Sequence, residues 1–117
     1  MTLQTEQEKK SRPEKEHLCH FDIAGFTYYD GPEAFEQLKI GTILQLKIDP
    51  DNKFDARAVA IYFNEFKLGF IPRNENRIIF KLLKVKFTGL ETRIQRIDPC
   101  AHPENQVGVI VHLKSTI

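Results

Sequence analysis

The fold class is decided by one stretch of the chain, Val59-Ala60-Ile61-Tyr62-Phe63-Asn64-Glu65-Phe66-Lys67-Leu68-Gly69-Phe70. Apolar residues occupy every second position from Val59 to Phe63 and again from Phe66 to Phe70, which is the period of a strand with one buried face. The pair Asn64-Glu65 between the two runs is suited to a tight turn. The stretch therefore predicts a β-hairpin.

Similar alternation extends the β structure in both directions along the chain. Further strands are predicted near residues 18–24, 44–48, 92–96 and 107–113, with Gly25 as a bulge or bend after which Phe26 and Tyr28 take the other face. Two short helices are predicted, one over residues 32–38 and one over 78–83 with Asn74 as its cap. About six strands and two short helices predict a mainly β domain, an OB-like small β-barrel.

Length and composition indicate one globular domain. The chain has 117 residues, of which 41% are hydrophobic and 28% are charged. Residues 1–16 are predicted to be a disordered polar tail, and residues 17–117 the domain. The net charge of +1 gives no argument for nucleic acid or for a membrane. A cytoplasmic protein without a membrane segment is expected.

The segment that follows the second predicted strand is the most informative candidate site. It runs Asp49-Pro50-Asp51-Asn52-Lys53-Phe54-Asp55. Asp, Asn and Pro are common in turns, so the segment has a purely structural interpretation as well. It also resembles the start of a calcium loop, but Phe54 and Ala60 stand where such a loop needs glycine and glutamate.

The order of motifs around this segment resembles the HIRAN domain family. Tyr28-Tyr29-Asp30-Gly31 comes first, then the Asp49–Asp55 segment, then Ala58-Val59, and finally Gly69-Phe70-Ile71-Pro72-Arg73. The resemblance covers nearly all of the chain from Phe21 onward. It implies an OB-like barrel that recognises the 3′ end of single-stranded DNA, in DNA repair or processing, with DNA-processing proteins as further partners.

The resemblance also assigns roles to individual residues. Tyr28 and Phe54 would stack on terminal bases, Asp55 would accept a hydrogen bond from the 3′ hydroxyl, and Arg73 would meet a phosphate. Asn52 would add a polar contact. The DNA-binding set is completed by Tyr29, Lys67 and Phe70. Cations that could offset the acidic segment are Lys47, Lys53, Lys67, Arg73 and Arg77.

Two other functions are compatible with the sequence. The same aromatic face could bind a peptide in place of DNA. A zinc site is the second alternative, because Zn²⁺ binds Cys and His; its candidate ligands are Cys19, His20, Cys100 and His102, with His17 nearby. No catalytic motif is present, so an enzyme is not expected and no cofactor other than zinc is considered.

A basic stretch late in the chain has two interpretations. It comprises Lys84, Lys86, Arg93 and Arg96. If Thr92 and Ile94 point into the barrel, Arg93 points outward. Solvated surface charge is the simpler interpretation, and a groove that follows phosphates is the sharper one.

Overall fold

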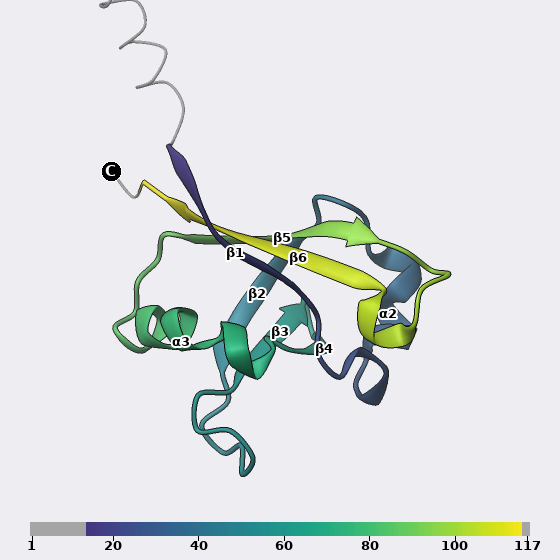
Figure 1. Cartoon of the computed structure of the whole chain (residues 1–117), viewed down its shortest axis with the longest axis horizontal. Coiled ribbons are helices and arrows are strands. Elements are labelled where there is room, and N and C mark those ends of the chain that lie inside the picture. Colours follow the sequence, from purple (N-terminus) through teal and green to yellow (C-terminus); the bar gives the residue numbers. More distant parts are fainter. Residues whose placement is uncertain (1–13, 116–117) are drawn as a thin grey trace, which may run out of the picture.

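The predicted hairpin lies at one end of a six-stranded antiparallel sheet that closes into a barrel. In the computed structural model, which describes residues 14–115, strand β3 (Val59–Phe63) pairs antiparallel with β4 (Phe66–Phe70). The remaining strands are β1 (Lys15–Asp22), β2 (Ile43–Ile48), β5 (Leu90–Ile97) and β6 (Val107–Lys114). All pairings are antiparallel, and the strand order is β1-β6-β5-β2-β3-β4 (Figure 1).

The two ends of this sheet meet just after β1. The Ala24 amide donates to the Phe70 carbonyl at 2.9 Å, and the Phe70 amide donates to the Ala24 carbonyl at the same distance. This bridge joins the chain after β1 to the free edge of β4 and so closes the barrel. The predicted OB-like barrel is therefore confirmed.

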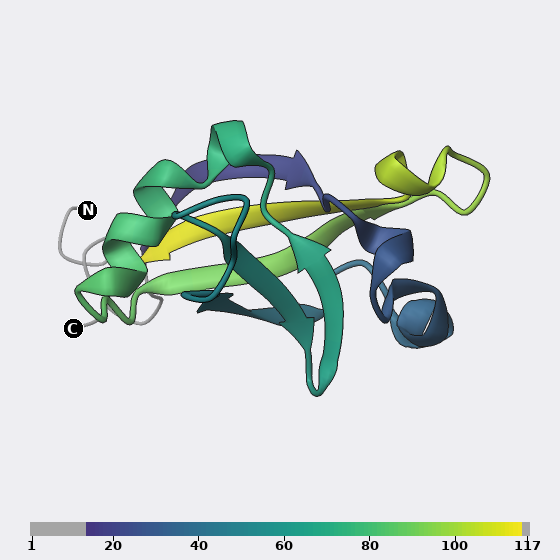
Figure 2. The same ribbon diagram turned by 90° about the horizontal axis from the view of Figure 1, so that it is seen from below.

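Short helices fill the gaps between strands. They are η1 (Phe26–Tyr28), α2 (Gly31–Ala34), η2 (Phe35–Gln37), η3 (Arg73–Glu75), α3 (Arg77–Lys84) and η4 (Pro103–Asn105). Figure 2 shows α3 and the α2 region at opposite ends of the barrel. Ile79 of α3 and Phe26 of η1 are both buried in the core that the strands enclose. The helices thus plug the two ends.

Three local predictions were wrong. Gly25 has a φ of 73° and directly precedes the 3-10 helix η1. Phe26 and Tyr28 belong to that helix, so they do not lie on the other face of a strand. Asn76, not Asn74, precedes α3, and its side chain makes no capping bond. Strand β1 begins at Lys15, inside the predicted tail, because Lys15 pairs with Lys114 of β6. The rest of that predicted tail lies outside the described residues, apart from Glu14.

Candidate functional site

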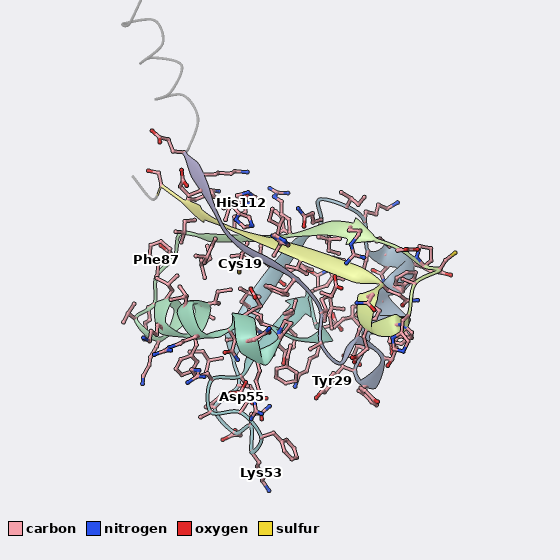
Figure 3. The ribbon with its side chains drawn as sticks, in the orientation of Figure 1. Cys19, Tyr29, Lys53, Asp55, Phe87 and His112 are labelled. Carbon is pink, nitrogen blue, oxygen red and sulfur yellow. The ribbon has the colours of Figure 1, made fainter. Side chains whose placement is uncertain are left out.

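A hollow of about 260 Å³ lies where the β2–β3 connection meets the barrel closure. Three separate parts of the chain contribute to it: the segment after β1, the connection itself, and the end of β4 with the residues that follow. Its lining residues are Ala24, Tyr29, Asn52, Phe54, Asp55, Ala58, Phe70, Ile71 and Arg73. Six predicted site residues are therefore brought together. Figure 3 shows Tyr29 and Asp55 on the same side of the molecule, with Lys53 at the far end of the connection.

Asn52 shapes the β2–β3 connection. Its side-chain oxygen accepts hydrogen bonds from the amides of Phe54, at 2.8 Å, and Asp55, at 2.9 Å. The Ala58 amide then donates to the Asp55 carbonyl and closes the next turn at 3.1 Å. Asn favours such local turns because its short side chain can satisfy backbone amides that would otherwise face solvent. The Asn52 side chain thus fixes where Phe54 and Asp55 project.

Asp55 is held in one orientation by neighbours from two segments. Its Oδ1 accepts from the Arg57 amide at 3.0 Å, and its Oδ2 accepts from Asn76 Nδ2 at 2.8 Å. The Arg73 Nε lies 3.9 Å from Oδ2. The side chain keeps 19% of its surface exposed, on the wall of the hollow. A carboxylate oxygen has two lone pairs, so each oxygen retains acceptor capacity for a ligand.

Two aromatic rings, Tyr29 and Phe70, also line the hollow, and Lys67 lies against both of them. Tyr29 and Phe70 meet edge to face, with ring centroids 5.5 Å apart. The Lys67 ammonium lies 4.7 Å from the Tyr29 ring centroid and 4.5 Å from that of Phe70. It also lies 3.9 Å from Asp49 Oδ2. The ammonium group therefore makes cation–π contacts with both rings and places a positive charge beside them.

Phe54 and Tyr28 are unusually exposed for aromatic residues. Phe54 is 85% exposed and Tyr28 is 81% exposed. Phe54 lines the hollow and does not fill the interior of the barrel. Tyr28 lies in η1 next to Tyr29 but does not line the hollow. Exposed aromatic rings next to a hollow are available to stack on a ligand.

Arg73 links the connection to the end of β4. Its Nη2 donates to the Phe54 carbonyl, and its Nε faces Asp55. The side chain is nevertheless 71% exposed, so donor groups of the guanidinium remain open to solvent. Arg73 thus both holds the rim of the hollow and presents a positive charge there.

Two glycines of the quoted motifs are required by close backbone approach. A Cβ on Gly31 would lie 2.4 Å from the Phe26 carbonyl oxygen, and one on Gly69 would lie 2.3 Å from that of Ala24. Gly69 also has φ of 146°. Gly31 thus lets η1 pack against α2, and Gly69 permits the barrel closure beside the hollow.

Two residues that position the site were not predicted from the sequence. Asn76 is fully buried and supplies the donor to Asp55. Asp30 Oδ2 accepts from the Lys67 amide at 3.0 Å and so ties the segment carrying Tyr29 to β4. The quoted motif Tyr28–Gly31 contains Asp30, which was a usable signal. Asn76 gave none, because its partner is 21 residues away in the sequence.

The predicted zinc cluster does not assemble. Within residues 14–115, no three His, Cys, Asp or Glu side chains come together in a group able to hold a metal ion. Cys19 and His20 lie on β1, whereas Cys100 and His102 lie in the β5–β6 connection. Burial, together with the Glu75 charge, raises the pKa of the Cys19 thiol to about 11, which disfavours the thiolate that zinc needs.

Two of the four cations in the predicted basic stretch, Arg93 and Arg96, are engaged within the protein. Thr92 and Ile94 are buried, as expected if Arg93 faces outward. Arg93 donates to the Gly41 carbonyl at 2.8 Å and pairs with Glu91. Arg96 donates to the Asn105 carbonyl at 2.7 Å and pairs with Asp22. These two guanidiniums therefore brace the barrel, and a phosphate groove built on Arg93 and Arg96 is not supported.

The match to a family model decides where the protein belongs. The model of the HIRAN domain matches residues 17–114. The chain belongs to the HIRAN domain family. HIRAN domains are DNA-binding modules, and the family is not catalytic by itself. No helix within residues 14–115 is long and apolar enough to cross a membrane.

Solved structures share this HIRAN fold at low sequence identity. A protein from Lactobacillus plantarum is 18% identical with a TM-score of 0.73, and the match covers 89% of this chain and 99% of that one. The HIRAN domain of human HLTF is 16% identical with a TM-score of 0.59, covering 82% of this chain and 72% of that one. No curated protein matches the sequence. At such identities the likeness shows the fold.

Proposed function

We propose that this domain binds single-stranded DNA at its 3′ end and that the hollow holds the terminal nucleotide. The observation that carries the proposal is the convergence of Asp55 with Tyr29, Phe54 and Arg73 around one hollow of about 260 Å³. Such a site offers rings for a base, an acceptor for a hydroxyl and a cation for a phosphate.

Asp55 supplies the selectivity for a chain end. A carboxylate repels a phosphate but accepts a hydrogen bond from a free hydroxyl, so it favours a terminal 3′ hydroxyl over a continuing strand. Asn76 and the Arg57 amide fix the orientation of the carboxylate before DNA arrives. A preoriented acceptor loses little entropy on binding.

Stacking and phosphate pairing supply the affinity. Tyr28, Tyr29, Phe54 and Phe70 present rings for the last bases, and each stacked base contributes about 1–3 kcal/mol without sequence preference. Lys67 and Arg73 lie beside these rings and offset the repulsion between Asp55 and the DNA backbone. Asn52 acts by holding Phe54 and Asp55 in place.

The domain would act as a recognition module in DNA repair or processing, with catalysis left to partner proteins. Membership of a DNA-binding family that is not catalytic by itself supports the recognition part of this proposal. A recognition module of this kind requires no cofactor.

The test compares two oligonucleotides that differ only at the 3′ terminus. Fluorescence anisotropy is measured with a label at the 5′ end and either a hydroxyl or a phosphate at the 3′ end. A hydrogen bond to a charged group contributes about 1.5–3 kcal/mol, so we expect about a 10- to 100-fold preference for the hydroxyl. Equal affinity for both ends would overturn the proposal.

A matched pair of variants assigns the preference to Asp55. Asp55→Asn should abolish the preference, because the amide lacks the charge that repels a terminal phosphate. Asp51→Asn removes an exposed carboxylate from the same connection and should preserve the preference. Loss of the preference in both variants would indicate a general effect of charge.

Peptide binding remains the competing function for the same aromatic rim. Salt distinguishes the two functions, because DNA binding releases counterions and this release becomes less favourable as the salt concentration rises. An affinity for single-stranded DNA that does not change between low and high salt would favour the peptide.

A further inference from the structure

Helix α3 lies in the most one-sidedly charged part of the chain. Residues 76–90 contain four cations, Arg77, Lys81, Lys84 and Lys86, and no Asp or Glu. The whole chain has 17 basic and 16 acidic residues, so this concentration is local. A local excess of one sign creates an attractive field even where the net charge is small.

Three of these cations share one face of α3. Arg77, Lys81 and Lys84 are spaced four and three residues apart, which places them in a row along a helix. All three are exposed. The opposite side of α3 packs on the core through Ile79, with Phe80 and Leu83 beside it. The basic row faces solvent because the apolar side of α3 packs against the core of the barrel.

The row is free of ion pairs within residues 14–115, whereas other cations of this part are engaged. Lys15, Arg93 and Lys114 pair with Glu91, and Arg96 pairs with Asp22. None of the ion pairs found there involves the α3 row. The row thus offers its charge to a ligand without first breaking a salt bridge.

The row continues from the candidate site. Arg73 lies on the rim of the hollow, four residues before Arg77, and η3 leads directly from one to the other. Figure 1 shows η3 near the centre of the molecule, above the β2–β3 connection, and α3 farther from that connection, to the left. Arg73, Arg77, Lys81 and Lys84 therefore form a basic track that leads outward from the hollow.

We propose that this α3 track binds the DNA backbone on the 5′ side of the nucleotides held in the hollow. The inference rests on the proposed function and extends it to the path of the strand. Arg77 to Lys84 spans about 10 Å at 1.5 Å per residue. That length allows the row to contact consecutive phosphates of one strand, so that more than one cation can act on the same backbone.

The experiment measures affinity against strand length. Oligonucleotides of increasing length, each with a 5′ label and a free 3′ hydroxyl, are titrated into the wild-type protein and the variant Arg77→Gln/Lys81→Gln/Lys84→Gln. We expect wild-type affinity to rise about 10-fold or more once the strand extends past the hollow. The variant should lose that gain, and its salt slope should fall by about 2. It should still bind the shortest strands like wild type.

A charge-matched control separates the track from the overall field. Lys81→Glu and Lys39→Glu change the net charge equally at exposed positions, but Lys39 lies between η2 and β2. Only Lys81→Glu should weaken long strands. Equal losses in both variants, or a triple variant that keeps the full gain with length, would overturn the track.

Failure of the track is distinguishable from failure of end recognition. A preference for the 3′ hydroxyl with no effect of the α3 changes would leave the proposed function standing and remove the track. An increase of affinity with strand length that depends on α3, without a preference for the 3′ hydroxyl, would remove end recognition and leave the α3 row as a DNA-binding surface. Binding of α3 to vesicles of anionic phospholipid in preference to DNA would also overturn it.

Discussion

Asn76 donates a hydrogen bond to Asp55 across 21 residues of sequence, from Nδ2 to Oδ2 at 2.8 Å. Asn76 is fully buried before α3, whereas Asp55 lies on the wall of the hollow. The bond ties the β2–β3 connection to the segment that leads into α3. It therefore couples the candidate site to the helix that carries the proposed basic track.

Replacing Asn76 should reduce both stability and selectivity. Asn76→Ala leaves a part-buried Asp55 oxygen without its donor, at a cost of about 1–3 kcal/mol in the free energy of unfolding. It should also lower the preference for a 3′ hydroxyl, because the carboxylate is less well oriented. Urea denaturation and anisotropy measure the two effects. Asn74→Ala, at an exposed position nearby, should change neither.

Gly69→Ala should open the barrel beside the site. The new Cβ would lie 2.3 Å from the Ala24 carbonyl oxygen, so we expect a loss of about 3 kcal/mol or more in the free energy of unfolding. Gly41→Ala is the control, because Gly41 has φ of 92° but nothing within 4 Å of the added carbon. It should cost only about 1–2 kcal/mol of backbone strain. If urea denaturation gave similar losses of unfolding free energy for Gly69→Ala and Gly41→Ala, the close approach of Gly69 to Ala24 would not be the cause.

Phe54→Ala should affect binding far more than stability. The ring is 85% exposed, so the free energy of unfolding should change by no more than about 0.5 kcal/mol. The loss of one stacking platform should weaken DNA binding by about 1–3 kcal/mol. Ile40→Ala, at another exposed apolar position, should leave both unchanged. An unchanged DNA affinity in Phe54→Ala would remove Phe54 from the site.

Glu91 should give the protein a stability component that is lost in acid. The hydrogen bond from Lys15, aided by Arg93, lowers the pKa of Glu91 from 4.5 to about 2. Because the folded pKa lies below the unfolded one, the stabilisation is present above about pH 5 and disappears as pH falls toward 2. Glu91→Gln should therefore destabilise the protein at pH 7 and approach wild type near pH 2. Urea denaturation across this range checks the convergence, which a constant difference would contradict.

The two cysteines should differ in reactivity. Cys19 is part-buried with a pKa raised to about 11, and Cys100 is exposed. Alkylation follows the thiolate and its access, so iodoacetamide at pH 8 should modify Cys100 well before Cys19. Mass spectrometry after timed quenching measures the order. In denaturing urea the two cysteines should be alkylated at similar rates. A difference in rate that persisted in urea would have a cause other than the fold.

The sequence predicted the barrel because strand periodicity is local. Apolar residues at every second position mark the inward face of each strand. The short turn sets the register of the β3–β4 hairpin as far as Tyr62, where the pairing shifts before Ile61. Local reasoning was wrong at Gly25 and at the start of α3. Both are places where the φ angle or a distant partner, and not periodicity, decides the conformation.

The sequence by itself determined the OB-like fold, the family and most residues of the candidate site, because each depends on motif order or on neighbours along the chain. Only the tertiary structure decided that Asp55 is oriented by Asn76, that Cys19 and Cys100 do not share a metal site, and that Arg93 braces the barrel. These outcomes depend on which segments barrel closure brings together. Side-chain partners many residues apart leave no periodic signal in the sequence.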